Sequence, residues 1–468
     1  MSEMLATFDA RERALVIGLG KSGRACIEVL RARGATVYAT DEKPVDALTE
    51  ALAMIERAGA RFVLPSDVGR VVPKLTSAIL SPGVPLTSPV VRTVQAANIP
   101  IFGEIEVAYR LCEAPIVAVT GTKGKSTTTA LIGHLLRACG HDVRVGGNIG
   151  NPLITEIAGA NARTWVVAEV SSFQLETIRL FKPHVAVLLN VAPDHLDRYH
   201  SMDEYAEAKF RIVANQSAND IFVGNLDDPR IAALRSVGDE HRMHAQQTWF
   251  TLGPRRDDAT MYVHDDAIVY APPGGDEHRV TVIERGEIPL AGEHNVQNVM
   301  AALLAALALG CEPIALREAV RSFRPMPHRL EPVAQIDGVL YVDDSKSTNP
   351  GSVIAALRAY ERPIVLIAGG RSKGTDFGEL GIEIRRRVQT LVAIGEAADE
   401  IASVSAGVAT VRATSMGDAV RRANAAASPG GVVLLSPGCA SFDMFTSAED
   451  RGEQFVRAVH ALREHAGA

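Results

Sequence analysis

The sequence predicts an α/β protein of three domains. Short runs of Val, Ile and Leu end in Gly, Pro or Asp and are followed by helix-like segments, the pattern of buried parallel strands that feed crossover helices. Two of these strand-to-helix turns are rich in glycine, as expected where a parallel sheet binds a phosphate group. At roughly 150 residues per domain, a chain of 468 residues can form three hydrophobic cores.

Ten runs carry the strand signal. They are almost continuously apolar rather than alternating, because a strand inside a parallel sheet is covered on both faces. They are residues 14–20, 36–41, 78–83, 115–121, 164–172, 185–193, 220–227, 364–370, 391–395 and 431–438. Another strand is expected at 338–344, and the less regular stretch 242–290 predicts antiparallel strands or hairpins.

Two segments predict the domain boundaries. Residues 110–115 (RLCEAP) separate one self-contained pattern of strands and helices from a new strand. Residues 324–332 (RPMPHRLEP) place three prolines between a long Ala/Leu-rich helix and the next strand. Proline disfavours continued helix and stiffens the connection. We therefore expect domains at residues 1–110, 111–328 and 329–468.

The composition limits the classes of function. Hydrophobic residues make up 47% of the chain and charged residues 22%, which is typical of a globular protein. Lys and Arg number 48 and Asp and Glu 55, so the formal net charge is −7. This balance argues against a nucleic-acid-binding protein. Any ligand that carries phosphate must therefore be held by local groups.

Cysteine usage and hydropathy predict a cytoplasmic protein. The five cysteines are far apart and none has CxxC spacing, which is typical of thiols in a reducing compartment. The N-terminal residues lack the apolar run of a signal peptide. The most apolar helical stretch, Val299 to Leu309, is too short to cross a bilayer. We also expect a monomer that inserts into no membrane.

The first glycine-rich turn is Gly18-Leu19-Gly20-Lys21-Ser22-Gly23, which fits GxGxxG between a strand and a helix. Asp41 ends the next strand, where an acidic side chain can bind a ribose hydroxyl. A second turn, Ser81-Pro82-Gly83, ends a later strand of the same sheet. Backbone amides of such a turn suit any diphosphate, so NAD and UDP both remain possible, as does a turn that binds nothing.

The second glycine-rich turn gives the strongest chemical signal. Residues 117–127 (VAVTGTKGKST) combine a strand, a turn and a helix start, and Gly124-Lys125-Ser126 matches the end of a phosphate-binding P-loop. Lys125 would contact the β- and γ-phosphates, and the Ser126 hydroxyl would bind Mg²⁺. Val119 stands where the first glycine of that motif belongs, so a variant loop is implied. The alternative is a simple helix cap.

Three further residues are expected near this loop. Glu169 and His195 each follow a buried strand, and Lys209 lies on the next predicted helix. Carboxylate oxygens would complete the ligand shell of Mg²⁺. Each residue alone also has an ordinary structural explanation, as a strand-end acid, a structural histidine or a solvated helix lysine.

Eight segments occur in an order that resembles the Mur ligases of peptidoglycan synthesis over essentially the whole chain. They are GTKGKST, AEVSSFQLE, NVAPDHLDRY, EYAEAKFRI, GEHNVQN, MPHRLE, DDSKSTNP and LLSPGCASFDMF. The resemblance implies a Rossmann-like N-terminal domain for a UDP-sugar substrate, a central P-loop-type ATPase domain and a Rossmann-like C-terminal domain for an amino acid. Residues 344–349 (DSKSTN) and 436–443 (SPGCASFD) resemble the members that add D-glutamate to UDP-N-acetylmuramoyl-L-alanine.

The resemblance also implies site residues. For the UDP substrate these are Gly20, Lys21, Ser22, Asp41, Ser81, Pro82, Gly83, Asn148 and His195. For ATP they are Gly121, Thr122, Lys123, Gly124, Lys125, Ser126, Thr127, Asn295, Asn298, Arg329 and Asp344. For D-glutamate they are Lys346, Thr348, Lys373 and Ser441. The implied catalytic residues are Lys125, Glu169, His195 and Lys209.

Two Mg²⁺ ions are implied in the same way. Ser126 and Glu169 would hold one, and His195 and Lys209 the other. The lysine at the Lys209 position is carbamylated in the family, which turns a cation into an oxygen ligand. Two residues depart from the family pattern: Lys123 replaces a more usual Asn, and Ala448 replaces a common Phe beside the amino-acid site.

Other functions stay open at this point. An NAD-dependent oxidoreductase would explain GLGKSG and Asp41 but not the P-loop, Glu169, Lys209 or DSKSTN. A noncatalytic nucleotide-binding or ATPase switch protein would turn over ATP without forming an amide. A related Mur ligase would add a different amino acid. A folylpolyglutamate-type synthetase would share the P-loop domain but lack the N-terminal domain.

Overall fold

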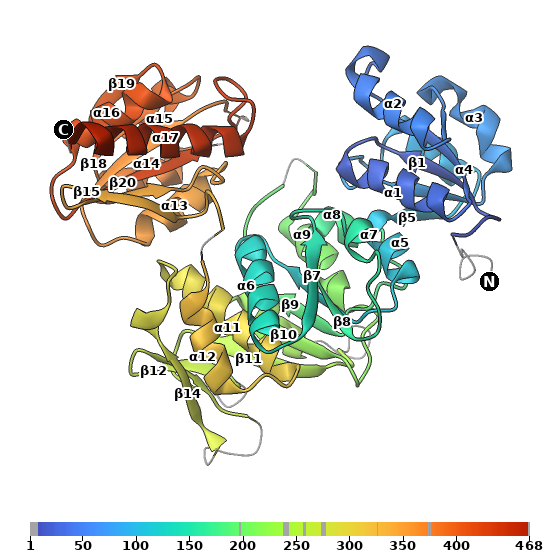
Figure 1. The fold of residues 1–468 in the computed structure, drawn as a ribbon, viewed down its shortest axis with the longest axis horizontal. Coiled ribbons are helices and arrows are strands. Elements are labelled where there is room, and N and C mark those ends of the chain that lie inside the picture. The colour runs from blue at the N-terminus through green and yellow to red at the C-terminus, as the bar shows by residue number, and fades with distance from the viewer. Residues whose placement is uncertain are drawn as a thin grey trace. The chain divides into compact units, whose positions relative to one another are not determined.

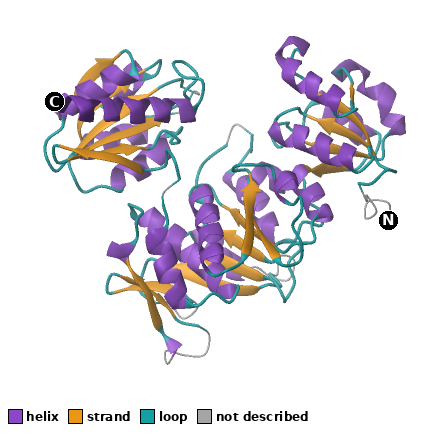
Figure 2. Cartoon of the chain, in the orientation of Figure 1, coloured by secondary structure: helices purple, strands orange, loops and turns teal. Residues whose placement is uncertain are grey.

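The chain is an α/β protein with three sheets flanked by helices (Figures 1 and 2). The computed structural model describes residues 8–195, 198–236, 243–255, 259–272, 278–324, 326–372, 374 and 376–466. The chain forms two compact units. One comprises 1–285 and 297–321, and the other comprises 286–296 and 322–468. The predicted fold class is confirmed.

The first sheet is entirely parallel, with strand order β3-β2-β1-β4-β5. Its strands are β1 (Arg13–Ile17), β2 (Thr36–Thr40), β3 (Arg61–Phe62), β4 (Ser77–Leu80) and β5 (Ile101–Gly103). Its helices are α1 (Lys21–Ala32), α2 (Thr49–Arg57), α3 (Val68–Val71), α4 (Pro89–Ala96) and α5 (Glu104–Leu111). From β1 the chain adds β2 and β3 on one side of the sheet and then crosses to add β4 and β5 on the other side. The strand order therefore reverses between β1 and β4. Ligands of open α/β sheets bind at such a point.

The close packing of α1 onto β1 depends on Gly23. A β-carbon at Gly23 would lie 1.9 Å from the carbonyl oxygen of Gly18 and 2.7 Å from the Ser81 hydroxyl oxygen. The third glycine of GxGxxG thus serves helix-to-strand packing, as that position does in dinucleotide folds.

The second sheet has strand order β14-β13-β12-β11-β10-β9-β6-β8-β7. Its strands are β6 (Ile116–Thr120), β7 (Asp142–Gly147), β8 (Thr164–Glu169), β9 (Val185–Leu188), β10 (Ile221–Asn225), β11 (Gln246–Thr251), β12 (Met261–His264), β13 (Ala267–Tyr270) and β14 (Val280–Glu284). The helices in this part of the chain are α6 (Lys125–Ala138), α7 (Leu153–Glu156), α8 (Ser172–Leu175), α9 (Met202–Phe210), α10 (Pro229–Ala233), α11 (Glu293–Ala308) and α12 (Pro313–Ser322). Strand β6, which leads into the P-loop, lies between β8 and β9.

The expectation for 242–290 is only partly right. Strands β12, β13 and β14 pair antiparallel, as expected. Strand β11, however, pairs parallel with β10 and extends the main sheet. Its sequence (QQTWFT) is apolar only toward its end. The first two residues of β11 are exposed and the last three are buried.

The third sheet has strand order β15-β16-β20-β17-β18-β19 and is parallel except for the β15–β16 pair. Its strands are β15 (Glu331–Ile336), β16 (Val339–Asp343), β17 (Ile364–Gly369), β18 (Val388–Ile394), β19 (Ala409–Ala413) and β20 (Val432–Gly438). Its helices are α13 (Pro350–Arg358), α14 (Gly378–Arg387), α15 (Ala398–Val404), α16 (Met416–Ala426) and α17 (Ala448–Ala466). The strand order reverses between β17 and β20.

Both faces of this sheet are buried. Leu366 and Ala368 of β17 pack into one core with α13, α14 and α15, while Val365 and Ile367 pack into another with α16 and α17 (Figure 1). This double covering explains why β17 is apolar at every position rather than alternating.

Two structural observations concern the expectations drawn from cysteine usage and hydropathy. All five cysteines are free, and Cys26, Cys311 and Cys439 are buried. Among the described residues, no helix combines the length and apolarity needed to cross a membrane. The expected cytoplasmic location and monomeric state stay predictions.

Gly23→Ala tests the contact between α1 and β1. We expect a loss of about 2 kcal/mol in the free energy of unfolding, because the added methyl group meets backbone that cannot move aside. Gly69→Ala on α3 is the matched control, since nothing lies within 4 Å of a β-carbon there. Urea unfolding followed by circular dichroism measures both. Equal stability of the two variants would contradict the packing role.

Candidate active site

The structure brings together the three N-terminal segments expected to bind a UDP substrate. The Ser81 hydroxyl donates a hydrogen bond to the Gly18 carbonyl oxygen over 2.8 Å, which joins the turns after β4 and β1. The Asp41 carboxylate, after β2, accepts a hydrogen bond from the backbone N–H of Leu19 over 2.7 Å. All three turns therefore lie at the point where the strand order reverses. Asp41 supports the turn through the backbone, a role that the ribose interpretation did not foresee.

The turn after β7 lies beside the first glycine-rich turn. The Lys21 ammonium donates a hydrogen bond to the Gly150 carbonyl oxygen over 2.5 Å. Two residues earlier, the Asn148 carboxamide donates to the Glu169 carboxylate over 2.8 Å. Lys21 and Glu169 thus contact the same turn, at Gly150 and Asn148 respectively.

The P-loop leads from β6 into α6 as predicted. Gly124 caps α6 with a φ angle of +83°, and a β-carbon there would lie 2.1 Å from the Asn298 Oδ1 atom, so glycine is required. The Lys125 ammonium donates hydrogen bonds to the carbonyl oxygens of Gly121 at 2.9 Å and Thr122 at 3.0 Å. The lysine side chain is therefore folded over its own loop.

Asn190 shapes the same loop, and the sequence reading missed it. Its side-chain oxygen accepts a hydrogen bond from the Lys123 N–H over 2.8 Å, and its amide group donates to the Lys123 carbonyl oxygen over 3.1 Å. Its backbone carbonyl accepts from the Thr122 N–H over 2.9 Å. The available signal was a polar residue inside the apolar run VAVLLNVAP, directly after β9.

Lys209 is buried, with 1% of its surface exposed, and lies against the P-loop. Its amine donates a hydrogen bond to the Gly121 carbonyl oxygen over 2.9 Å, the same oxygen that Lys125 contacts. Burial, followed by the nearby positive charge of Lys125, lowers the pKa of Lys209 to about 6. At neutral pH the side chain is therefore mainly the uncharged amine. It is not the solvated helix lysine that its surroundings in the sequence suggest.

Glu169 ends β8 beside the P-loop strand, paired in register with Val119 of β6. The residue is 3% exposed. One carboxylate oxygen accepts the hydrogen bond from Asn148, and the other is buried without a hydrogen-bond partner among the described residues. A buried carboxylate oxygen of this kind suits a divalent cation.

His195 is exposed, and its ring lies near two aromatic side chains. Its backbone has a φ angle of +54°, an uncommon conformation for histidine. Its ring centroid lies 4.8 Å from that of Phe173 and 6.4 Å from that of Tyr205. The Tyr205 hydroxyl lies 3.2 Å from the Thr122 hydroxyl, and the Lys209 amine lies 4.5 Å from the Tyr205 ring. Tyr205 thus links His195, Lys209 and the P-loop.

The other residues expected to bind ATP lie in the P-loop, on α6, on α11 and after α12. Asn298 lies on α11 against Gly124 and is buried, and Asn295 lies one turn earlier on the same helix. Lys123 pairs with Asp194 at 3.8 Å. Ser126, near the start of α6, is buried, and Thr127 follows it on the same helix.

Arg329 and Asp344 belong to the second unit, where Asp344 is nearly fully buried. The Asp344 carboxylate accepts hydrogen bonds from the Ser347 hydroxyl at 2.5 Å, the Ser436 hydroxyl at 2.8 Å and the Leu330 N–H at 3.2 Å. Burial raises the pKa of Asp344 to about 6.

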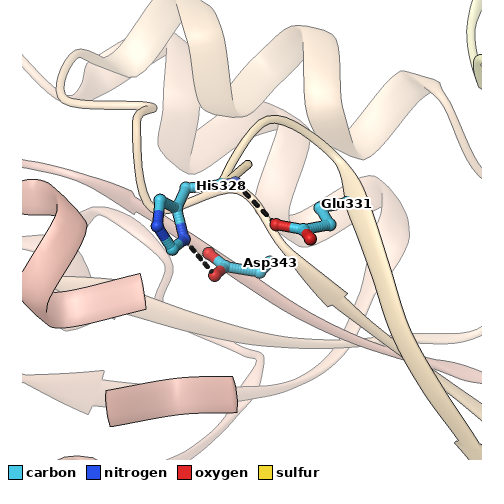
Figure 3. Close-up of side chains that lie close together, drawn as sticks. All are labelled: His328, Glu331 and Asp343. Carbon is cyan, nitrogen blue, oxygen red and sulfur yellow. Dashed lines mark hydrogen bonds and ion pairs between the residues drawn. The ribbon is translucent and has the colours of Figure 1, made fainter. Parts of the chain in front are cut away.

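The turn that carries Arg329 is fixed by a cluster that the sequence reading did not find (Figure 3). The His328 ring nitrogen Nδ1 lies 2.7 Å from the buried Asp343 carboxylate, and the His328 N–H donates to the Glu331 carboxylate over 2.8 Å. His328 and Leu330 both have left-handed backbones, with φ angles of 62° and 45°. Two such residues flanking Arg329 show that the surrounding contacts impose this turn.

Three of the residues expected to bind D-glutamate follow β16 or β20, which are neighbours in the third sheet. Lys346 pairs with Glu449, Thr348 is half-buried, and Ser441 is 2% exposed. Lys373 lies outside the described residues. The carbonyl oxygen of Ala448 accepts a hydrogen bond from the Ser345 hydroxyl over 2.7 Å.

The sequence matches three family models. Residues 12–103 match the Mur ligase MurD-like N-terminal domain, residues 119–306 the Mur ligase middle domain, and residues 328–439 the Mur ligase glutamate ligase domain. Each model covers one of the three sheets or most of it.

Solved structures share the fold over nearly the whole chain. UDP-N-acetylmuramate-alanine ligase MurC from Thermotoga maritima is similar with a TM-score of 0.59 at 19% identity, over 96% of this chain and 99% of that one. A pseudomurein peptide ligase type C from Methanothermus fervidus also has a TM-score of 0.59, at 17% identity, over 96% of this chain and 100% of that one.

Curated relatives are much more similar. A "UDP-N-acetylmuramoylalanine--D-glutamate ligase" from Pelotomaculum thermopropionicum is 42% identical over 464 residues, which are 98% of this chain and 100% of that protein. A protein of the same name from Geobacter metallireducens is 41% identical over 449 residues, 96% of this chain and 97% of that protein. With this likeness over its full length, the chain belongs to the Mur ligase family.

Proposed function

We propose that this Mur ligase joins D-glutamate to UDP-N-acetylmuramoyl-L-alanine in an ATP-dependent reaction. The observation that carries the proposal is the site at the carboxyl ends of β6, β8 and β9, where the P-loop, buried Glu169 and buried Lys209 meet. The choice of D-glutamate is supported by the likeness to relatives named for that reaction. In this proposal residues 1–110 hold the UDP substrate, 111–328 ATP and 329–468 D-glutamate.

The reaction must activate a carboxylate, which does not react with an amine in water. The L-alanyl carboxylate attacks the γ-phosphorus of ATP, the bond to the β-phosphate oxygen breaks, and an acyl phosphate and ADP form. The free amine of D-glutamate then attacks the carbonyl carbon. The tetrahedral intermediate expels phosphate, and the nitrogen loses a proton to leave the amide.

The P-loop residues bind and orient ATP. Backbone N–H groups at the start of α6 and the Lys125 ammonium suit the phosphate oxygens, because the helix N-terminus and the lysine both present positive charge. Lys125 is already within the loop, where it contacts Gly121 and Thr122. Asn190 holds Lys123 from both sides, so the loop keeps its curvature before ATP binds.

Residues near the loop fit a magnesium site. Ser126 and Glu169 would hold one ion, and His195 with carbamylated Lys209 would hold a second. The unpartnered Glu169 oxygen supports the first of these assignments. When bound, Mg²⁺ would neutralise charge on the transferred phosphoryl group.

The surroundings of Lys209 favour carbamate formation. An uncharged amine can attack CO₂ to give a carbamate and one proton, whereas an ammonium cannot. The Lys209 pKa of about 6 leaves most of the side chain uncharged at neutral pH. The carbamate supplies oxygen ligands, which Mg²⁺ prefers over nitrogen.

Substrate specificity is assigned to the other two sheets. The turns of Gly20 to Ser22 and Ser81 to Gly83, supported by Asp41, would hold the UDP group through backbone N–H groups and Lys21. Lys346, Thr348, Lys373 and Ser441 would hold the carboxylates of D-glutamate.

The decisive experiment measures phosphate release with ATP, UDP-N-acetylmuramoyl-L-alanine and a panel of amino acids. We expect release with D-glutamate alone, together with the amide product by mass spectrometry. Release with another amino acid would instead make the chain a related ligase. ATP hydrolysis that needs no amino acid would indicate a switch protein, and NADH binding without ATP turnover an oxidoreductase.

Lys209→Arg tests the carbamate. Arginine keeps a positive charge but cannot form the carbamate, so we expect turnover to fall by about 100-fold or more. In the unchanged protein, removal of CO₂ should lower phosphate release and bicarbonate should restore it. Because the Lys209 pKa is about 6, this restoration should fail as the pH falls below that value and the amine becomes protonated.

Lys182→Arg is the matched control for this prediction, since Lys182 is partly exposed and pairs with Asp220. It should keep normal turnover and the normal CO₂ response. Near-normal activity of Lys209→Arg would exclude Lys209 as the ligand of a second Mg²⁺.

Asn190→Ala tests the loop clamp. Two side-chain hydrogen bonds are lost, and at about 1 kcal/mol each the KM for ATP should rise roughly thirtyfold. Asn215→Ala is the control, because Asn215 also donates two hydrogen bonds to backbone, to the carbonyl oxygens of Arg179 and Phe181. The proposal requires the ATP KM to change in the first variant and not in the second.

A further inference from the structure

Arg451 is a buried charged residue that none of the assigned roles uses. It lies in the first turn of α17, is only 1% exposed and is the largest fully buried side chain among the described residues. Burial lowers its pKa to about 10, with the nearby Asp443 and Asp343 opposing the shift. The guanidinium therefore stays charged at neutral pH inside the second unit.

The guanidinium joins two loops. Its Nε donates a hydrogen bond to the Ser345 hydroxyl at 3.0 Å, and one terminal nitrogen donates to the Ser345 carbonyl oxygen at 2.8 Å. The other terminal nitrogen donates to the Cys439 carbonyl oxygen at 3.1 Å. Among the described residues, no carboxylate forms a hydrogen bond or ion pair with it. The planar group thus uses its directed donors on backbone and hydroxyl oxygens.

Both loops carry residues assigned to the amino-acid substrate. Ser345 directly precedes Lys346, and Cys439 comes two residues before Ser441. The loops also share one backbone hydrogen bond, from the Gly438 N–H to the Ser347 carbonyl oxygen at 2.9 Å. Ser345 is fixed to α17 a second time, because its hydroxyl donates to the Ala448 carbonyl oxygen. Arg451 therefore fixes the spacing of the two loops where they carry Lys346 and Ser441.

A contribution to the stability of the fold does not by itself explain why the charged Arg451 occupies this buried position. Burying an ion is costly, and an apolar side chain of similar size often packs at least as well. A planar group with directed donors, in contrast, sets the distance and angle between the loops it contacts. Its positive charge also lies beside a site for a dicarboxylate.

We propose that Arg451 is a positioning residue of the amino-acid site, which holds the loops after β16 and β20 so that Lys346 and Ser441 can bind the two carboxylates together. This inference rests on the proposed function. It assigns to Arg451 no contact with the substrate.

The test compares Arg451→Met and Arg451→Lys by steady-state phosphate release, with each substrate varied in turn. For Arg451→Met we expect the KM for D-glutamate to rise at least about tenfold, with the KM values for ATP and the UDP substrate within about twofold of normal. Arg451→Lys keeps the charge but lacks the planar fork, so it should recover only part of the D-glutamate affinity.

Two further variants separate positioning from stability. Val459→Ala removes two methyl groups from a fully buried side chain of the same helix, so it should lower the melting temperature and leave the KM for D-glutamate unchanged. Ser345→Ala removes one acceptor of Arg451 and should raise that KM to a smaller extent. If Arg451→Met does not fold, the KM of Ser345→Ala for D-glutamate tests the proposal in its place. Equal effects of all the variants on the three KM values, or no selective effect on D-glutamate, would overturn the proposal.

Failure of the proposed function would look different. If the unchanged protein uses another amino acid, the D-glutamate assignment is wrong, but a selective rise in the KM of that amino acid would still support Arg451 as a positioning residue. If the unchanged protein uses D-glutamate and the Arg451 variants keep a normal KM for it, only the role of Arg451 is wrong.

Discussion

The parallel arrangement of the strands is the constraint on which the candidate site depends. In a parallel sheet with crossover helices, every strand ends at the same edge, so segments far apart in the sequence meet there. Gly121 of the P-loop, Glu169 and Asn190 lie at the carboxyl ends of three different strands of the second sheet. The turns of the first sheet and the loops after β16 and β20 are built in the same way.

Burial then decides the chemical state of the groups at these edges. In an acidic chain, the few cations that bind anions must be placed individually. Burial makes Lys209 an uncharged amine and raises the pKa of Asp344, whereas Arg451 keeps its charge. The same physical effect thus favours the neutral form of all three groups, and Arg451 stays charged because the pKa of a guanidinium starts far above neutral pH.

Much of the fold could be predicted from the sequence because both faces of its central strands are covered. All ten apolar runs form strands. Strands β3, β5, β7, β15 and β19 were missed. Strands β3 and β5 have only two or three residues, too few to show a pattern, and exposed or half-buried residues interrupt the apolar pattern of the other three. The parallel pairing of β11 could not be predicted, since its direction depends on the neighbouring β10 and not on its own residues.

The sequence by itself determined the α/β class, the two glycine-rich turns and the residue types of the candidate site, because these follow from local patterns and motif spacing. Only the tertiary structure decided the surroundings of each group. Asn190 became a clamp on Lys123, Asp41 a support for the turn after β1, and Arg451 a link between two loops. These roles depend on contacts between distant segments and on exclusion of water, which a linear pattern does not contain.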